Sequence, residues 1–273
     1  GNPKPRIFRL EKDQALINRL GFNNHGSEVI SKRISNNRPD GILGINIGPN
    51  KDTKNKEDDY FTCLATLAIY SNYITINISS PNTEGLRNFH DQSEMEKLLV
   101  GLNKIKKDKK IDQPIAIKLS PDIDDGDVSR IVELIKRYSI QGIIISNTTD
   151  SNRDNLSDVK KNEVGGLSGQ PLKDISTNLI KKFYKDTKGK IKIIGVGGVD
   201  SGQSAFEKIA AGADAVQLYT GMIYKGPGIV KDIKKELISI LKKENFENIS
   251  QAIGINAWPT NSQELYSSRK IYV

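Results

Sequence analysis

Six short apolar segments rich in Ile and Val recur along the chain and predict strands. Each has about five or six residues and little alternation of apolar and polar positions, which is typical of strands buried on both faces. The predicted strands are Ile42–Ile47, Tyr73–Ile78, Ile115–Leu119, Gly142–Ser146, Ile191–Val196 and Ala215–Tyr219.

Helical periodicity fills the segments between these strands. Apolar residues share one helix face in four sets: Leu98, Leu99, Leu102 and Ile105; Val128, Ile131, Val132 and Ile135; Leu179, Ile180 and Phe183; and Ile229, Ile233, Leu237 and Leu241. Ser93 and Glu96 form a capping-box pattern ahead of the first set. We expect two further helices, from Ser27 to about Ile34 and from near Ser201 to Gly212.

Alternating strands and helices predict a parallel sheet with right-handed crossovers. A doubly wound sheet and a closed barrel both fit this alternation, but no G-x-G-x-x-G follows the first strand. Nearly every strand ends in polar residues or glycines, and in a (β/α)8 barrel these ends meet at one mouth. We therefore predict an α/β fold of the (β/α)8 TIM-barrel type.

The two ends of the chain differ from this central part. Residues 1–41 contain no comparable buried strand, and residues 255–273 lack periodicity and are expected to form an unpacked tail. The pattern thus predicts one barrel domain over residues 1–254.

Composition excludes several classes of site. The net charge is +8, but aromatic residues are not interleaved with the basic ones, so we do not expect nucleic acid as a partner. The excess lysines are explained by solvated helix surfaces, by an anionic membrane or by a phosphate-bearing ligand. One cysteine and two distant histidines predict neither a disulfide nor a metal site, and we see no signal-peptide core or membrane-spanning run.

Two glycine clusters end the last two predicted strands. Gly197 and Gly198 follow one strand, and Tyr219, Thr220 and Gly221 follow the next. Backbone N–H groups after the last strands of a barrel commonly hold a phosphate, and glycine lets the backbone approach closely. The alternative is that these glycines only make tight turns.

Asparagines and one lysine end the other predicted strands. Asn46, Asn77 and Asn147 can donate and accept hydrogen bonds at once, which suits the edge of a planar heterocycle. Lys118 ends a buried strand, which is costly unless it faces an anion such as a reduced flavin. Pairing with a structural carboxylate is the alternative.

The segment Ser79-Ser80-Pro81-Asn82-Thr83 follows the second predicted strand. A serine there acts as a nucleophile or base only if another group activates it, and neither histidine is placed beside it. By itself, this segment predicts an ordinary turn.

Several motifs together resemble class 2 dihydroorotate dehydrogenases, in the order in which that family carries them. The matching segments are residues 1–10, 17–24, 44–48, 77–87, 146–149, 165–169 and 216–221. The resemblance implies oxidation of dihydroorotate to orotate in pyrimidine (UMP) biosynthesis, with FMN as cofactor and a quinone as electron acceptor.

The resemblance also implies roles for individual residues. Ser80 matches the catalytic base, where class 1 relatives carry cysteine. The positions expected to bind FMN are Asn46, Asn77, Lys118, Ser146, Gly169, Gly197, Gly198, Tyr219 and Thr220. The positions expected to bind substrate are Asn18, Arg19, Leu20, Gly21, Phe22, Asn77, Asn82, Asn147 and Thr148. The segment Ser80–Leu86 would close over the substrate as a lid.

Two departures from the family pattern lead to further expectations: the start of the family's barrel is not recognised, and the segment after Gly254 matches nothing in the family. The six predicted strands fit the third to eighth strands of the family, so we expect an incomplete barrel that lacks the first two. The helices through which class 2 members meet membrane and quinone are not recognised either. A bacterial protein of this family is expected at the cytoplasmic side of the inner membrane, as a peripheral protein. The alternative function is that of a truncated, non-catalytic relic or binding protein.

Overall fold

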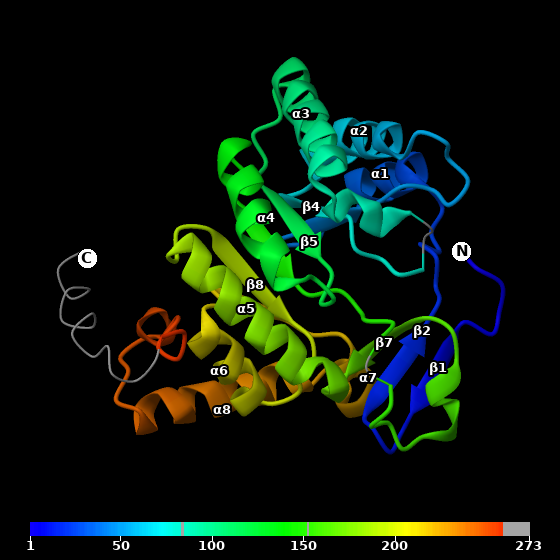
Figure 1. The fold of residues 1–273 in the computed structure, drawn as a ribbon. Coiled ribbons are helices and arrows are strands. Elements are labelled where there is room, and N and C mark those ends of the chain that lie inside the picture. Colours follow the sequence, from blue (N-terminus) through cyan, green and yellow to red (C-terminus); the bar gives the residue numbers. More distant parts are fainter. Residues whose placement is uncertain (83–84, 152, 259–273) are drawn as a thin grey trace.

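A parallel six-stranded sheet forms the centre of the computed structural model, which describes residues 1–82, 85–151 and 153–258 (Figure 1). The strand order is β3-β4-β5-β6-β8-β9, so successive strands of this sheet are neighbours throughout. The strands are β3 (Gly44–Ile47), β4 (Tyr73–Asn77), β5 (Ile115–Leu119), β6 (Gly142–Ile145), β8 (Lys192–Val196) and β9 (Ala215–Gln217). All six predicted strands are confirmed, although several are shorter than expected.

Helices lie along the outer face of this curled sheet (Figure 1). They are α1 (Ser27–Asn36), α2 (Lys56–Leu67), α3 (Gln92–Lys109), α4 (Asp125–Arg137), α5 (Lys173–Thr187), α6 (Gly202–Ala211) and α8 (Ile229–Lys243). The short helix α7 (Thr220–Lys225) lies instead beside a second, smaller sheet. Short 3-10 helices are η1 (Ala68–Tyr70), η2 (Leu86–His90), η3 (Val159–Asn162), η4 (Gln170–Leu172) and η5 (Ile249–Ala252). This arrangement agrees with a TIM-type α/β fold.

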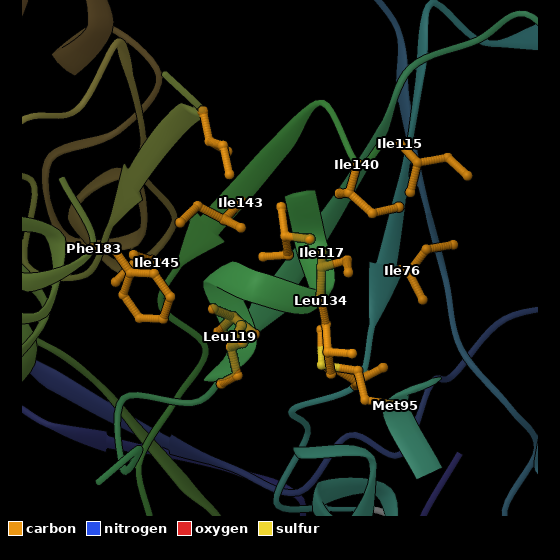
Figure 2. Close-up of a cluster of buried hydrophobic side chains, with 14 of the residues drawn as sticks. Ile76, Met95, Ile115, Ile117, Leu119, Leu134, Ile140, Ile143, Ile145 and Phe183 are labelled. Atoms are coloured by element: carbon orange, nitrogen blue, oxygen red, sulfur yellow. The ribbon is translucent and has the colours of Figure 1, made fainter. Parts of the chain in front are cut away.

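The main hydrophobic core fills the space between the sheet and these helices. Figure 2 shows Ile117, Ile143 and Ile145 of the strands beside Leu134 of α4 and Phe183 of α5. All five side chains are buried. Burial of aliphatic side chains stabilises each by about 1.5–3 kcal/mol, so this layer fixes the strands in place.

The other face of the sheet is more polar and carries the residues expected at the mouth. The register places Asn46 opposite Thr75, and Asn77 opposite Lys118, so their side chains share this inner face. Across the inner face, Gln217 Nε2 of β9 donates to Tyr73 Oη of β4 at 3.3 Å. Among the described residues, β3 and β9 have no second strand partner and form the free edges of the sheet.

The N-terminal region corrects the prediction that residues 1–41 contain no buried strand. β1 (Ile7–Leu10) and β2 (Ala15–Asn18) form an antiparallel hairpin, and β2 also pairs with β7 (Gly166–Gly169). The first three residues of β2 are buried. The hydroxyl of Tyr224 in α7 lies 3.1 Å from Leu10 O and 2.9 Å from Ala15 O, which joins the hairpin to the end of the large sheet.

Helix boundaries mostly follow the predictions. Ser201 and Gly212 flank α6 as expected, and α1 begins at Ser27. The predicted cap of α3 is wrong, because the side chain of Asp91 accepts from Ser93 N at 2.9 Å and makes Asp91 the N-cap. Asp91 is the better cap since it also places a negative charge at the positive end of the helix.

The first residues of the predicted C-terminal tail are packed against the domain, which corrects that part of the prediction. Asn256 N donates to Ala210 O at 2.8 Å, and Ala257 is fully buried in the main core. The segment after Gly254 is therefore packed against α6 as far as Ala257. Residues 259–273 of the predicted tail lie outside the described residues.

Candidate functional site

A cavity of about 160 Å³ opens where β5, β6, β8 and β9 end. It brings together ten of the predicted site residues: Asn18, Lys118, Ser146, Asn147, Thr148, Gly169, Gly197, Gly198, Tyr219 and Thr220. We call it the main cavity. Its lining contains no acidic side chain.

One end of the main cavity is made of glycine backbone. Gly197 and Gly198 have φ angles of 118° and 67°, a conformation that other residues rarely adopt. Gly197 O accepts from Ser176 Oγ at 3.4 Å, on the side away from the cavity. Because the N–H of a trans peptide points opposite to its carbonyl, the N–H of Gly198 is turned away from Ser176. Among the described residues this N–H has no hydrogen-bond acceptor.

Close packing behind these glycines also requires the absence of a side chain. A Cβ atom on Gly198 would lie 2.5 Å from Lys173 Cβ and 2.7 Å from Lys173 Cα. A Cβ atom on Gly169 would lie 2.4 Å from Gln14 O. These contacts show that the glycines are needed for packing and positive φ as well as for open backbone.

Lys118 contributes a cation without a partner. No carboxylate or other acceptor among the described residues lies within bonding distance of its Nζ, so the predicted alternative of a structural ion pair is wrong. Burial is the cause that lowers the pKa of Lys118. An anion beside this amine would reverse that shift, which makes the cavity suited to a negatively charged ligand.

Side-chain amides form two pairs at the other end of the site. Asn147 Nδ2 donates to Asn77 Oδ1 at 3.1 Å, and Asn82 Nδ2 donates to Asn18 Oδ1 at 3.3 Å. Thr148 N donates to Asn147 Oδ1 at 2.8 Å. Asn18, Asn77 and Asn147 lie at or just after the ends of β2, β4 and β6, and Asn82 lies in the loop after β4. Their remaining donors and acceptors can serve a polar planar ligand.

The two serines after β4 have different surroundings. Ser79 is fully buried and donates to Lys118 O at 2.7 Å, while Asn147 Nδ2 donates to Ser79 Oγ at 3.0 Å. Ser80 is half-buried, and its Oγ accepts from Asn82 N at 3.3 Å. The hydroxyl proton of Ser79 is thus donated to Lys118 O, whereas that of Ser80 has no hydrogen-bond acceptor among the described residues. The predicted lid Ser80–Leu86 includes residues 83 and 84, which lie outside the described residues.

Eight predicted site residues do not line the main cavity. Asn77 and Asn82 bond to Asn147 and Asn18, which do line it, and Ser80 bonds to Asn82. The other five are Asn46, Arg19, Leu20, Gly21 and Phe22. Asn46 is exposed on the free edge strand β3. Arg19 pairs with Glu163 at 3.0 Å and Leu20 lines a different cavity. Gly21 and Phe22 form a left-handed turn with φ angles of 67° and 54°. Of the segment 18–22, only Asn18 reaches the main cavity.

A second cavity of about 210 Å³ adjoins the first. It is lined by Ile7, Arg9, Leu16, Asn18, Leu20, Ser168, Tyr219 and Ile223. Asn18, Ser168 and Tyr219 line both cavities. The aliphatic residues at its mouth are exposed, with Ile7 at 54% and Ile223 at 43%. We call it the apolar cavity.

Sequence reasoning gave no role to two polar residues at the site. Ser168 Oγ lies 2.8 Å from Thr220 Oγ1, which links β7 to α7 across the main cavity. Arg87 bridges Asp122 at 3.0 Å and Asp150 at 2.7 Å, and donates to Thr148 O at 3.3 Å. Both residues lie in segments that match the family, 77–87 and 165–169, and this match could have marked them as site residues.

The histidines and the cysteine lie elsewhere. His90 Nε2 accepts from Ser120 N at 3.4 Å, and burial lowers the pKa of His90 to about 4. Among the residues that the structure describes, no group of His, Cys, Asp and Glu side chains has the geometry of a metal site. The helices formed by these residues include none with the length and apolarity needed to cross a membrane.

Comparison with protein families matches this chain to the family described as dihydroorotate dehydrogenase, over residues 1–241. A "Dihydroorotate dehydrogenase (quinone)" from Rhodopseudomonas palustris (strain BisB5) is 41% identical over 97% of this chain and 74% of its own length. The protein of the same name from Bartonella tribocorum is 43% identical over 91% of this chain and 70% of its own length.

Solved structures agree with these relatives. The crystal structure of DHODH in complex with ferulenol from Eimeria tenella superposes with a TM-score of 0.90 and 36% sequence identity. The superposition covers 95% of this chain and 76% of that one. The likeness therefore extends over both sheets.

Proposed function

Because the chain belongs to the dihydroorotate dehydrogenase family, we propose that it oxidises dihydroorotate to orotate in pyrimidine biosynthesis, with FMN bound in the main cavity. The observation that carries this proposal is the lining of the main cavity. It combines an unpartnered lysine amine and the open N–H of Gly198 with Asn147 and Asn18, each of which is paired with a second asparagine behind it.

The main cavity has the chemistry that FMN needs. Its phosphate would lie against Gly197, Gly198, Tyr219 and Thr220, where open N–H groups can donate to it. Lys118 would offset the negative charge of the reduced flavin ring. Asn46, Asn77, Ser146 and Gly169 complete the proposed set.

Dihydroorotate would bind beside the flavin at the asparagine pairs. Asn18, Asn77, Asn82, Asn147 and Thr148 supply amide and hydroxyl groups that match the substrate's own amides and carboxylate. The predicted roles of Arg19, Leu20, Gly21 and Phe22 stay predictions, because these residues lie outside the main cavity.

Ser80 is proposed as the base that removes the proton from carbon 5 of dihydroorotate. When bound, FMN supplies the acceptor for the hydride that leaves carbon 6. Serine is a weak base, so its own hydroxyl proton must pass to a relay as Ser80 Oγ takes the proton from carbon 5. The bond from Asn82 N to Ser80 Oγ would stabilise the negative charge on that oxygen as its proton leaves. Exclusion of water around Ser80 strengthens the same interaction.

A quinone is proposed as the final electron acceptor, entering through the apolar cavity. This cavity shares three lining residues with the main cavity, so a ring within it would be close to a bound flavin. Exposed Ile7 and Ile223 at its mouth suit contact with lipid, where quinones dissolve. We propose peripheral attachment to the cytoplasmic side of a bacterial inner membrane.

The free edges of the large sheet support a larger barrel. β3 and β9 each present unpaired backbone groups in the described part of the chain, and Asn46 is exposed beside one of them. We propose that the six strands are the third to eighth of a (β/α)8 barrel, and that strands between β3 and β9 complete the flavin pocket.

The test of this function follows flavin reduction in the full-length protein. Anaerobic mixing with dihydroorotate should bleach the flavin absorbance in a stopped-flow experiment. Ser80→Ala should slow this reduction by about 10²-fold or more while FMN content stays the same, in line with losses of a general base.

Ser80→Cys is the matched control, since the thiolate of a cysteine at this position can accept the proton. Its reduction rate should recover as pH rises toward the pKa of the thiol, whereas Ser80→Ala should show no recovery. Reduction of Ser80→Ala at the wild-type rate would remove Ser80 from this role. An FMN-loaded protein that dihydroorotate never reduces would favour the non-catalytic alternative.

A further inference from the structure

A buried lysine lies behind the glycine end of the main cavity. Lys208 of α6 has no exposed surface, which is rare for a lysine. Its Nζ donates to Lys173 O at 3.2 Å, to Thr177 Oγ1 at 3.0 Å and to Ser176 Oγ. All three protons of a charged ammonium are thus satisfied by neutral oxygens.

The strand above makes room for this side chain. A Cβ atom on Gly195 of β8 would lie 3.2 Å from Lys208 Cδ, so the lysine stem passes directly beneath the strand. Gly195 comes two residues before Gly197. The charge is therefore held at the base of the loop that forms the glycine end.

A hydrogen-bond chain connects the lysine to that loop. Lys208 Nζ donates to Ser176 Oγ, and Ser176 Oγ lies 3.4 Å from Gly197 O. The carbonyl of Gly197 and the N–H of Gly198 belong to one peptide group and point in opposite directions. Holding the carbonyl toward Ser176 turns the N–H of Gly198 away from it, on the side where Gly198 lines the cavity.

We propose that Lys208 and Ser176 are positioning residues for the phosphate of FMN. They hold the Gly197–Gly198 peptide with its N–H toward the anion, and they place a positive charge behind it. This inference rests on the proposed function. Neither residue lines the main cavity, so both act through the backbone between them and the ligand.

Charge around Lys208 supports this role. Burial lowers the pKa of Lys208 to about 7, so its protonation changes in the neutral range. The charged groups that act on it are Glu207, Asp174 and Lys173. Glu207 is engaged by Lys173 Nζ at 3.3 Å and does not hydrogen-bond to Lys208. A bound phosphate would therefore add a stabilising charge that the protein itself does not provide.

The experiment compares FMN with riboflavin, which has the same ring system but no phosphate. Dissociation constants are measured by fluorescence quenching on the full-length protein after the flavin has been removed. Ser176→Ala should weaken FMN about 10-fold and leave riboflavin unchanged within about twofold, in line with the loss of a hydrogen bond in a charged network. Thr177→Val, which removes a Lys208 partner without touching Gly197, should affect FMN less than Ser176→Ala.

Lys208→Met keeps the length of the side chain and removes its charge. It should weaken FMN by about 10- to 100-fold, again without affecting riboflavin. Phosphate binding raises the lysine pKa, so wild-type affinity for FMN should be highest below pH 7 to 8 and fall as pH rises further. This decline should be absent in Lys208→Met. If that variant fails to fold, Ser176→Ala and the wild-type pH profile still test the proposal.

Equal losses for both flavins would show a merely structural role and overturn the proposal. Unchanged affinity for FMN in Ser176→Ala would overturn it as well. A wild-type protein that binds neither flavin would instead overturn the proposed function, which separates the two failures.

Discussion

The two ends of the main cavity are built in different ways. At the glycine end, the backbone of Gly197 and Gly198 lines the cavity and is fixed by packing against α5, with the N–H of Gly198 open. At the asparagine end, the side chain of Asn147 lines the cavity and is fixed mainly by hydrogen bonds to Asn77 and Ser79. One end uses the absence of side chains, and the other uses side chains as the ligand-binding groups.

This difference decides what a substitution changes. At the glycine end, any added side chain disturbs the backbone even in the ligand-free protein. At the asparagine end, a side chain can be shortened without shifting the backbone, so binding changes more than folding. The predictions below test this contrast, beginning with the largest expected effect.

Gly198→Val should abolish retention of FMN, lowering its affinity by more than about 100-fold. A Cβ at this position collides with Lys173 and the backbone would leave its positive φ, which costs about 1–3 kcal/mol or more. The flavin content of the purified protein measures the effect, and unfolding temperature should fall as well. Gly228→Val is the control, since nothing lies within 4 Å of a Cβ there. A yellow Gly198→Val protein with normal absorbance would contradict the assignment of this end to phosphate.

Lys118→Met should weaken FMN by about 10- to 30-fold without lowering the unfolding temperature. The amine has no partner among the described residues, so its replacement removes a desolvated cation and costs no ion pair. Calorimetry of the flavin-free protein and flavin titration together measure both effects. Lys109→Met on the exposed end of α3 is the control. A large drop in the stability of the flavin-free variant would mean that Lys118 is structural.

Asn82→Ala should raise the KM for dihydroorotate about 10-fold and leave the affinity for FMN unchanged. It removes the bond to Asn18 and a ligand-facing amide, worth about 0.5–1.5 kcal/mol for a neutral hydrogen bond. Steady-state kinetics and flavin titration separate the two quantities. A parallel loss of FMN would show that the two ends are not independent.

Stability should decrease by about 1–3 kcal/mol as pH falls from 6.5 to 4, because of His90. Burial lowers its pKa to about 4 in the folded protein, so the unfolded chain takes up this proton at higher pH than the folded one. The contribution is complete above about pH 6.5 and is lost as pH falls through the folded pKa. Urea unfolding across this range measures it. His90→Gln should flatten the curve, and His25→Gln, at the exposed histidine, should not.

The sequence predicted the large sheet well because its strands follow one another in space. Isoleucine-rich segments such as Ile115–Leu119 are buried on both faces and pair with their sequence neighbours. β2 was missed because its second pairing partner, β7, lies some 150 residues away, and its local partner β1 is half-exposed and gives no strong apolar pattern. Propensity in so short a segment is a weak signal when tertiary pairing determines the strand.

Within the site, the motifs located the residues but not their contacts. The sequence could not show that Ser79 is locked by Lys118 O while Ser80 is not, since the two are adjacent and chemically identical. It also gave no sign that Lys208 is buried. A lysine in an amphipathic helix normally faces solvent, and only the apolar segment Ile209–Ala211 beside it hinted otherwise.

The pairing of β2 with β7 has a consequence for the order in which the protein folds. β2 can pair on its second side only after β7, which ends at Gly169, has been synthesised. Tyr224, whose hydroxyl bonds to Ala15 O, is synthesised later still. At about 5–20 residues per second, the ribosome needs roughly ten seconds or more to add this stretch. A lone two-stranded hairpin is only marginally stable in water, so β1 and β2 stay unfinished during that time. Asn18 therefore takes its place in the cavity only after β7 is available, and the cavity is incomplete on any nascent chain that ends before Gly221.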